Sequence, residues 1–210
     1  NVFFSTDFGD TWYYPLDNAL VTRPIFEVVT DSSGQYAALV TGNSGGTPGS
    51  VYISSDFGST WDSIDFDNGS NQYTGVQMSS NGQKIIVVDS LVTSGIYLST
   101  DFGQTMEALP NATNSTVANI VASSDLQFIM TYDYGCMQSS YASGDGGESW
   151  NRTEYTTDAD SSSFFTMASS GSGQLEVGAD YGGGSFLYQP ACPEGYAHVG
   201  FDPVTDPNGT

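Results

Sequence analysis

Short runs of alternating apolar and polar residues recur along the chain, and segments rich in Ser, Gly and Asp separate them. One set of runs reads NVFF, VYIS, IYLS and SYAS, at residues 1–4, 51–54, 96–99 and 140–143. A second set follows a Ser/Gly turn and lies in the segments 31–40, 79–88, 123–130 and 169–178. Because alternation with a period of two residues is typical of half-buried strands, the pattern predicts an all-β protein of short antiparallel strands joined by turns.

Each run of the first set leads directly into a polar octapeptide. The four octapeptides are STDFGDTW (5–12), SSDFGSTW (54–61), STDFGQTM (99–106) and SGDGGESW (143–150). Their aspartates are Asp7, Asp56, Asp101 and Asp145, so the octapeptide recurs every 44 to 49 residues. Such a period is typical of architectures in which one supersecondary unit stacks on the next.

One repeat unit therefore reads as strand A, a Ser/Gly turn, strand B, a variable Gly-rich loop, strand C, the octapeptide turn and strand D. Four antiparallel strands in about 40 to 50 residues match the blade of a β-propeller. The predicted fold is an all-β propeller of four-stranded antiparallel blades over residues 1–190, with four to five blades or as part of a larger propeller. Residues 191–210 are predicted to form a separate tail.

The side chains of the octapeptide predict a turn that is closed by its own hydrogen bonds. The Asp carboxylate can accept N–H bonds from its own turn, the Ser and Thr hydroxyls extend that network, and Gly provides a positive φ. The Trp is expected to leave the turn and pack between blades. A carboxylate used in this way is not free for a substrate, so these roles are structural rather than catalytic. The residues concerned are Ser5, Asp7, Gly9, Thr11, Trp12, Ser54, Asp56, Gly58, Thr60, Trp61, Ser99, Asp101, Gly103, Thr105, Ser143, Asp145, Gly147, Ser149 and Trp150.

The octapeptides resemble the Asp boxes, or BNR repeats, whose pattern is S/T-x-D-x-G-x-S/T-W. The resemblance covers nearly the whole chain, to about residue 190. It implies the propeller fold found in sialidases, xyloglucan hydrolases, sortilin-type receptors and a photosystem assembly factor. The chain departs from the pattern at Met106, which replaces Trp, at Gly144 and Gly146, and after SFLYQP, where ACPEGY stands in place of a fifth box.

The octapeptides and the Ser/Gly turns are expected on one rim of the propeller, so the B–C loops and the D–A segments lie on the opposite rim. In propellers, that rim and the central channel usually carry ligands. Tyr134 and Tyr181 occupy matching DYG positions there, where they could stack on a sugar ring or simply cap strand ends. The acidic residues expected in the D–A segments are Asp62, Asp65, Asp67, Glu154, Asp158 and Asp160.

The resemblance raises two enzymatic alternatives. Sialidases bind the substrate carboxylate with three arginines, and this chain has only Arg23 and Arg152, which excludes a sialidase site. Xyloglucan hydrolases use two carboxylates across a cleft, so a pair such as Asp65 and Asp158 leaves a glycoside hydrolase as an alternative. His198 is the only histidine, which leaves no Ser-His-Asp system in the propeller and no histidine metal cluster.

The charge balance limits the classes of partner that the protein is expected to bind. The chain has 24 Asp and Glu against 3 Lys and Arg, a formal net charge of −21. Phosphate backbones and anionic lipid surfaces repel such a chain, so neither nucleic-acid binding nor membrane insertion is expected.

N-x-S/T sequons predict an N-glycosylated protein that is secreted or at the cell surface, and they oppose the photosystem resemblance. They lie at Asn68, Asn111, Asn114, Asn151 and Asn208, and the first four are expected in D–A segments.

Cys136 and Cys192 are the only cysteines. They are expected on opposite rims, beyond the Cα separation of ~7 Å that a disulfide allows, although a tail that folds back would let them pair. The tail from Cys192 resembles the opening of an EGF-like cysteine-rich module, which implies a partner beyond Thr210. No cofactor is predicted, and the acidic segments DADSSS and DPVTDPNGT leave Ca²⁺ as an alternative to solvated loops.

The sequence as a whole predicts a non-catalytic extracellular module with a structural or recognition role in a surface glycoprotein or a fibrous assembly. The runs at 1–4 and 185–188 are both C strands, so the units do not fill whole blades. Three outcomes are compatible with this pattern: the first and last pieces close a small ring, belong to a larger propeller, or are completed by strands of a neighbouring subunit. Expected partners are the protein's own subunits, other extracellular proteins or carbohydrate. The alternatives are a carbohydrate-binding propeller and a glycoside hydrolase.

Overall fold

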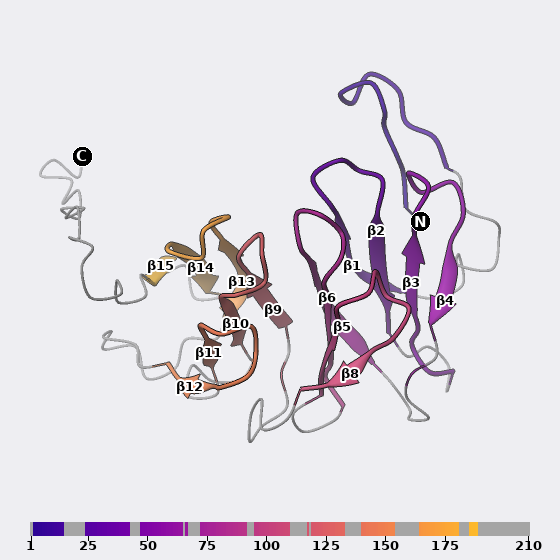
Figure 1. Ribbon diagram of the computed structural model, residues 1–210. Coiled ribbons are helices and arrows are strands. Elements are labelled where there is room, and N and C mark those ends of the chain that lie inside the picture. The colour runs from indigo at the N-terminus through magenta and orange to yellow at the C-terminus, as the bar shows by residue number, and fades with distance from the viewer. Residues whose placement is uncertain are drawn as a thin grey trace, which may run out of the picture.

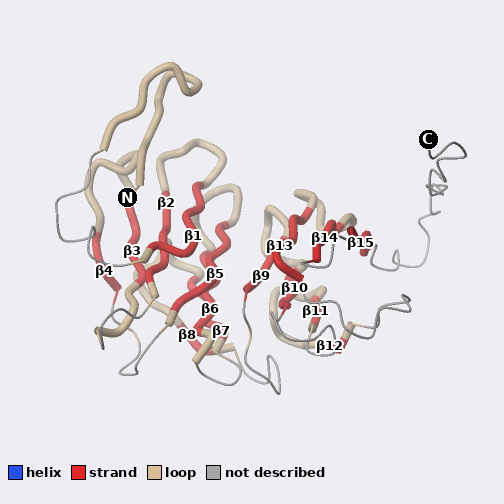
Figure 2. The backbone as a smooth tube through the Cα atoms, turned by 180° about the vertical axis from the view of Figure 1, so that it is seen from behind, coloured by secondary structure: helices blue, strands red, loops and turns tan. Residues whose placement is uncertain are grey.

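The protein is described by a computed structural model over residues 2–14, 24–42, 47–64, 66, 72–91, 95–109, 117, 119–132, 140–153, 164–180 and 185–188. Within these ranges the backbone forms strands and turns but no helix (Figure 2). None of the described segments is therefore a helix long and apolar enough to cross a membrane.

The strands form four antiparallel sheets, in each of which the spatial order follows the chain order. The first sheet contains β1 (Ile25–Thr30), β2 (Ala37–Thr41), β3 (Val51–Ser54) and β4 (Asp62–Ile64). The second contains β5 (Tyr73–Met78), β6 (Ile85–Asp89), β7 (Ile96–Ser99) and β8 (Glu107–Ala108). The third contains β9 (Asn119–Ala122), β10 (Ile129–Tyr132), β11 (Tyr141–Ser143) and β12 (Asn151–Arg152). The fourth contains β13 (Phe164–Ser169), β14 (Glu176–Asp180) and β15 (Ser185–Tyr188).

The four sheets stack side by side in a row (Figure 1). The first strand of each sheet contacts the first strand of the next, so that β1 meets β5, β5 meets β9 and β9 meets β13. The alternating apolar residues of these strands bury one hydrophobic cluster between each pair of neighbouring sheets. The core is therefore divided among the contacts between sheets, as expected where no single sheet can bury both of its faces.

Residues 2–14 form an N-terminal hairpin. Its two arms are joined by reciprocal hydrogen bonds between Phe4 and Tyr13, each 2.9 Å long. Val2 and Phe4 pack with Leu39 on the face of the first sheet that points away from the second. The hairpin thus covers part of that face, and the octapeptide 5–12 forms its turn.

Two residues lie elsewhere than the sequence predicted. Asp62 and Asn151 were expected in D–A segments at the opposite rim, but they are the first residues of β4 and β12. Strand D pairs with strand C immediately after the octapeptide, with Ile53 opposite Asp62 and Ala142 opposite Asn151. Both side chains are exposed and lie at the octapeptide end of their strands.

Candidate functional site

Each octapeptide is closed by the same set of hydrogen bonds. In 54–61, the Ser54 hydroxyl donates to Asp56 Oδ1 (2.9 Å) and accepts from the Gly58 N–H (2.9 Å). The Thr60 N–H donates to Asp56 Oδ1 (2.8 Å), and the Thr60 hydroxyl donates to Asp56 Oδ2 (2.7 Å). Equivalent bonds form in 5–12, 99–106 and 143–150. Both oxygens of every octapeptide carboxylate are thus engaged within the turn.

These bonds lower the pKa of the octapeptide aspartates. The Thr60 N–H and hydroxyl hold the pKa of Asp56 below its ordinary value, because hydrogen bonds to the charged form favour it. For Asp7 and Asp101 the largest cause of the lowered pKa is the hydroxyl of Thr11 and of Thr105. The Ser149 hydroxyl, followed by the Ser149 N–H, brings the pKa of Asp145 to about 2. All four side chains are ionised at neutral pH, as turn acceptors must be.

The backbone of the turn explains one departure from the repeat. Two consecutive residues have positive φ, such as Phe57 (60°) and Gly58 (77°), and Phe8 and Phe102 adopt the same left-handed conformation. In the fourth octapeptide this Phe position holds Gly146, with a φ of 74°. Since glycine tolerates positive φ without steric cost, the substitution fits the turn. The sequence had assigned the positive φ to one glycine alone.

The tryptophans do not all behave as predicted. Trp61 packs against Phe4, with ring centroids 5.9 Å apart, and Trp150 packs on the cluster between the second and third sheets. Met106 packs on the cluster between the first and second sheets. Trp12, however, is 63% exposed, because no described residue lies where the preceding sheet would cover it. Each of the three Trp side chains also donates from Nε1 to the Gly carbonyl of its own turn at 3.0 Å, a bond that the sequence analysis missed.

Hydrogen bonds also join the turns to one another. The Phe57 N–H donates to the Gln35 carbonyl (3.0 Å), which ties the octapeptide to the A–B turn of the same sheet. The equivalent bonds run from Phe102 to Gln83 and from Gly146 to Gln127. These bonds place both kinds of turn at the same end of each sheet, as the sequence predicted.

A further series of bonds runs from sheet to sheet through the A–B turns. The Ser32 N–H donates to the Ser80 carbonyl (2.9 Å), the Ser80 N–H to Ser124 (2.7 Å), and the Ser124 N–H to Gly171 (2.8 Å). The Ser32 and Ser124 hydroxyls donate to the same two carbonyls as their own N–H groups. Ser32, Ser80 and Ser124 hold equivalent positions in their turns, and this repeated serine was the sequence signal for the series.

Glu27 clamps the first sheet to the second. Its carboxylate, on β1, accepts from the Val76 N–H (2.9 Å) and from the Gln77 side chain (3.1 Å), both on β5. Burial between the strands raises the pKa of Glu27 to about 7, and these two bonds only partly offset that effect. Sequence reasoning missed Glu27, because the equivalent positions on the other inner strands hold Gly75 and Asn119 and so give no repeat.

A second buried carboxylate lies at the end of β6. Asp89 is fully buried, and its Oδ1 accepts from the N–H groups of Gln72 (3.2 Å) and Leu91 (2.9 Å). Among the described residues, its Oδ2 and the buried Thr74 hydroxyl have no hydrogen-bond partner. Asp89 thus caps two loop N–H groups beside β5. In the described part of the chain, no three His, Cys, Asp or Glu side chains are grouped so that they could hold a metal ion.

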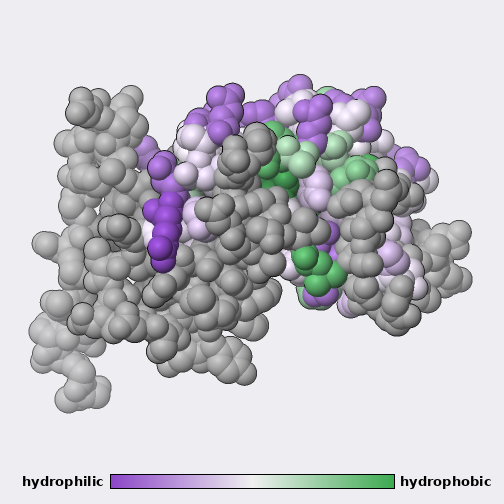
Figure 3. All heavy atoms as spheres, turned by 90° about the horizontal axis from the view of Figure 1, so that it is seen from below, coloured by the Kyte–Doolittle hydropathy of each residue, from purple (hydrophilic) through white to green (hydrophobic). Residues whose placement is uncertain are grey.

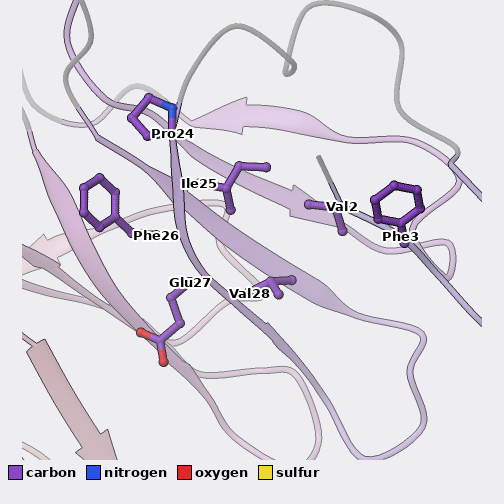
Figure 4. A pocket seen from close by; sticks show the side chains of 7 residues that line it. All are labelled: Val2, Phe3, Pro24, Ile25, Phe26, Glu27 and Val28. Atoms are coloured by element: carbon purple, nitrogen blue, oxygen red, sulfur yellow. The ribbon is translucent and has the colours of Figure 1, made fainter. Parts of the chain in front are cut away.

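A cavity of about 580 Å³ lies against β1, between this strand and the N-terminal hairpin. It is lined by Val2, Phe3 and the segment 24–28. In Figure 4, Val2 and Phe3 lie on one side of Ile25 and Val28, and the Glu27 carboxylate is directed away from them. Except for Glu27, all of the lining residues are apolar. Elsewhere, the face in Figure 3 shows hydrophobic side chains in separate patches among hydrophilic ones.

Most of the other predicted site residues lie outside the described residues. Asn151 is exposed on β12, and Arg152 follows it there. The predicted stacking pair, the possible disulfide, the remaining sequons and the carboxylate pair proposed for a hydrolase fall on undescribed positions. These positions are Tyr134, Tyr181, Cys136, Cys192, Asn68, Asn111, Asn114, Asn208, Asp65 and Asp158. The tail 191–210 and the two suggested Ca²⁺ segments, 158–163 and 202–210, also lie outside the described residues.

The sequence matches no known protein-family model and no curated protein. Its structure, however, is similar to several solved structures. The GH74 xyloglucanase from Xanthomonas campestris matches with a TM-score of 0.60 and 18% identity, over 79% of this chain and 29% of the enzyme. YCF48 bound to D1 peptide matches with a TM-score of 0.56 and 17% identity, over 81% of this chain and 53% of that one. An ancestral GH74 enzyme matches with a TM-score of 0.57 and 16% identity, over 85% of this chain and 24% of the enzyme.

These similarities show the fold. The chain is an all-β propeller built from four-stranded antiparallel blades, some of them partial, as the sequence predicted. It spans no more than about half of the length of each of these structures. The neighbours include both GH74 enzymes and YCF48, so the fold is compatible with more than one function.

Proposed function

We propose that this chain is a non-catalytic propeller module of a secreted, N-glycosylated protein, in which it has a structural or recognition role. The octapeptides are then Asp boxes in the structural sense, each of which closes the turn between two neighbouring strands. The module acts through the faces and edges of its sheets.

One observation supports this proposal above the others: the described carboxylates with shifted pKa values all serve the scaffold. The octapeptide aspartates accept hydrogen bonds from their own turns. Asp31 and Asp125 do the same in A–B turns, and Glu27 joins two sheets. A general acid or base needs a carboxylate that can exchange a proton with a substrate, and a carboxylate held by its own turn is not available for this.

The sequons and the acidity favour the extracellular setting. Asn151 is exposed on the outermost strand of the third sheet, where an attached glycan would project into solvent. The net charge of −21 disfavours anionic partners. YCF48 bound to D1 peptide shows that a propeller of this kind can bind a peptide.

A glycoside hydrolase is the second candidate, favoured by the similarity to GH74 enzymes. It would need two carboxylates flanking a cleft, about 5 to 9.5 Å apart. Asp65 and Asp158 are the pair suggested for this role by the sequence.

The test is to produce the chain in a eukaryotic secretory host and to measure its intact mass and its activity on xyloglucan. We expect a mass above that of the polypeptide, which falls after N-glycan removal, and no release of reducing ends. The variant Asn151→Gln should lose one glycan, and Asn43→Gln, outside any sequon, should lose none. Xyloglucan turnover that Asp65→Asn or Asp158→Asn abolishes would replace the proposal by the hydrolase, and an unglycosylated secreted chain would contradict the extracellular setting.

A further inference from the structure

The contact between neighbouring sheets is built three times from equivalent residues. In each contact, a residue of the second strand of one sheet and a residue of the first strand of the next share one buried cluster. The pairs are Ala38 with Val76, Ile86 with Ile120, and Met130 with Met167. The strand registers show that the three pairs are equivalent, since Ala37, Ile85 and Ile129 each pair with the Ser that begins an octapeptide.

The two ends of the row expose the two halves of this same contact. Val28, on β1, is equivalent to Val76, Ile120 and Met167, which are at most 9% exposed, yet Val28 itself is 46% exposed. Val177, on β14, is equivalent to Ala38, Ile86 and Met130, which are fully buried, yet Val177 is 45% exposed. One end therefore lacks a preceding sheet, and the other lacks a following sheet.

The series of hydrogen bonds between A–B turns leaves a free acceptor at one end of the row and a free donor at the other, among the described residues. Each turn donates its N–H to the carbonyl of the next, from Ser32 to Ser80, then to Ser124 and then to Gly171. Among the described residues, the Ser32 carbonyl receives no N–H and the Gly171 N–H finds no acceptor. One end of the row thus offers an acceptor and the other a donor, in the positions where the series would continue.

The N-terminal hairpin leaves part of the first face open beside β1. The N-terminal hairpin covers its outer part through Val2 and Phe4, which pack on Leu39. What remains beside β1 is the cavity lined by Phe3, Phe26 and Val28, which are 55%, 47% and 46% exposed. Large exposed apolar side chains gathered in one hollow mark a surface that another protein element covers.

We propose that this face binds β13 and β14 of a second copy of the chain, so that the stack of sheets continues head to tail between molecules. Val177 of one copy then packs on Val28 of the other, and the Gly171 N–H of the first donates to the Ser32 carbonyl of the second. The hairpin strand that carries Phe4 takes the place that β15 holds in the isolated chain. The contact is heterologous, because two different surfaces meet, so it builds rings or filaments of copies.

A second copy fits better than the fourth sheet of the same chain. In Figures 1 and 2, the hairpin and β1 lie toward one end of the row and β14 and β15 lie at the other. The two faces lie apart within one chain in this arrangement. This inference rests on the structural role proposed above, and it names the partner through which that role is performed.

Two variants test the contact, each with one added cysteine in a chain whose Cys136 and Cys192 are replaced by serine. Chains carrying Val28→Cys and Val177→Cys are mixed under mild oxidation, and cross-linked peptides are identified by mass spectrometry. A disulfide between positions 28 and 177 in this mixture can form only between two molecules. We expect this link to exceed severalfold the link formed when Leu91→Cys, at an equally exposed apolar residue outside both faces, replaces Val177→Cys.

Equal yields from the two mixtures, or no link at 28–177, would overturn the proposal. The double variant Val28→Cys/Val177→Cys shows whether the two faces instead meet within one chain. At low concentration, a link within single chains that outcompetes the link between chains would also overturn it, in favour of ring closure by one molecule. A chain that is monomeric, glycosylated and inactive on xyloglucan would overturn this inference but not the proposed function. Hydrolysis of xyloglucan would instead overturn the proposed function.

Discussion

At the scale of single residues, the serine that begins each octapeptide contributes more to the stability of the fold where it is buried. Ser54 is 1% exposed, and its hydroxyl satisfies the buried N–H of Gly58. We expect Ser54→Ala to lower the free energy of unfolding by about 1–3 kcal/mol, because the N–H is left buried without a partner. Ser5→Ala is the matched control, since its Gly9 N–H is exposed and can turn to water. Equal losses in denaturant titrations would contradict this reading of the turn.

Glu27 should make stability depend on pH in a range where few other groups titrate. Its pKa is raised from 4.5 to about 7 in the folded protein, so the unfolded chain releases this proton first as pH rises. The contribution is therefore complete below about pH 4.5 and is lost as pH rises through about 7. Glu27→Gln should reduce the fall in unfolding free energy between pH 4.5 and 7 by on the order of 3 kcal/mol, since one pKa unit corresponds to about 1.4 kcal/mol. Parallel pH profiles of wild type and variant would refute the clamp.

At the scale of elements, glycines set how closely one sheet approaches the next. Gly103 has a φ of 82°, and a Cβ there would overlap Cδ1 of Ile53 on the preceding sheet. Gly34 has a φ of 74° but open space around it. We expect Gly34→Ala to cost about 1–2 kcal/mol for the left-handed backbone alone, and Gly103→Ala to cost clearly more. Thermal unfolding of the two variants separates steric overlap from backbone strain, and similar losses would show that the sheets can move apart.

The elements also show what a sequence of this kind reveals. The strands, their order and the self-closing octapeptides were predictable, because alternation and a repeated turn are local signals that recur in every unit. The Glu27 clamp was not predictable, because it occurs once and depends on which strand lies opposite. The exposure of Trp12 was missed for a related reason: packing between sheets depends on a neighbour that a single repeat does not encode.

At the scale of the whole molecule, charge should oppose the association of copies. A formal net charge of −21 makes two chains repel each other, and salt screens that repulsion. We expect the apparent association constant of the chain to rise severalfold between low and physiological ionic strength, as measured by sedimentation equilibrium. The apolar contact between Val28 and Val177 has no charged pair for salt to weaken. A fall in association with salt would indicate an interface built on ion pairs instead.

The average mass in solution of the chain produced in a eukaryotic secretory host, measured by light scattering over a range of concentrations, tests the central claim most directly. That claim is that the exposed strands at both ends of the row continue, between molecules, the contact that stacks the sheets within one molecule. We expect a mass that rises with concentration above that of one chain, with Val28→Asp remaining a folded single chain and Leu91→Asp behaving as wild type. A wild-type mass of one chain at every concentration would contradict it.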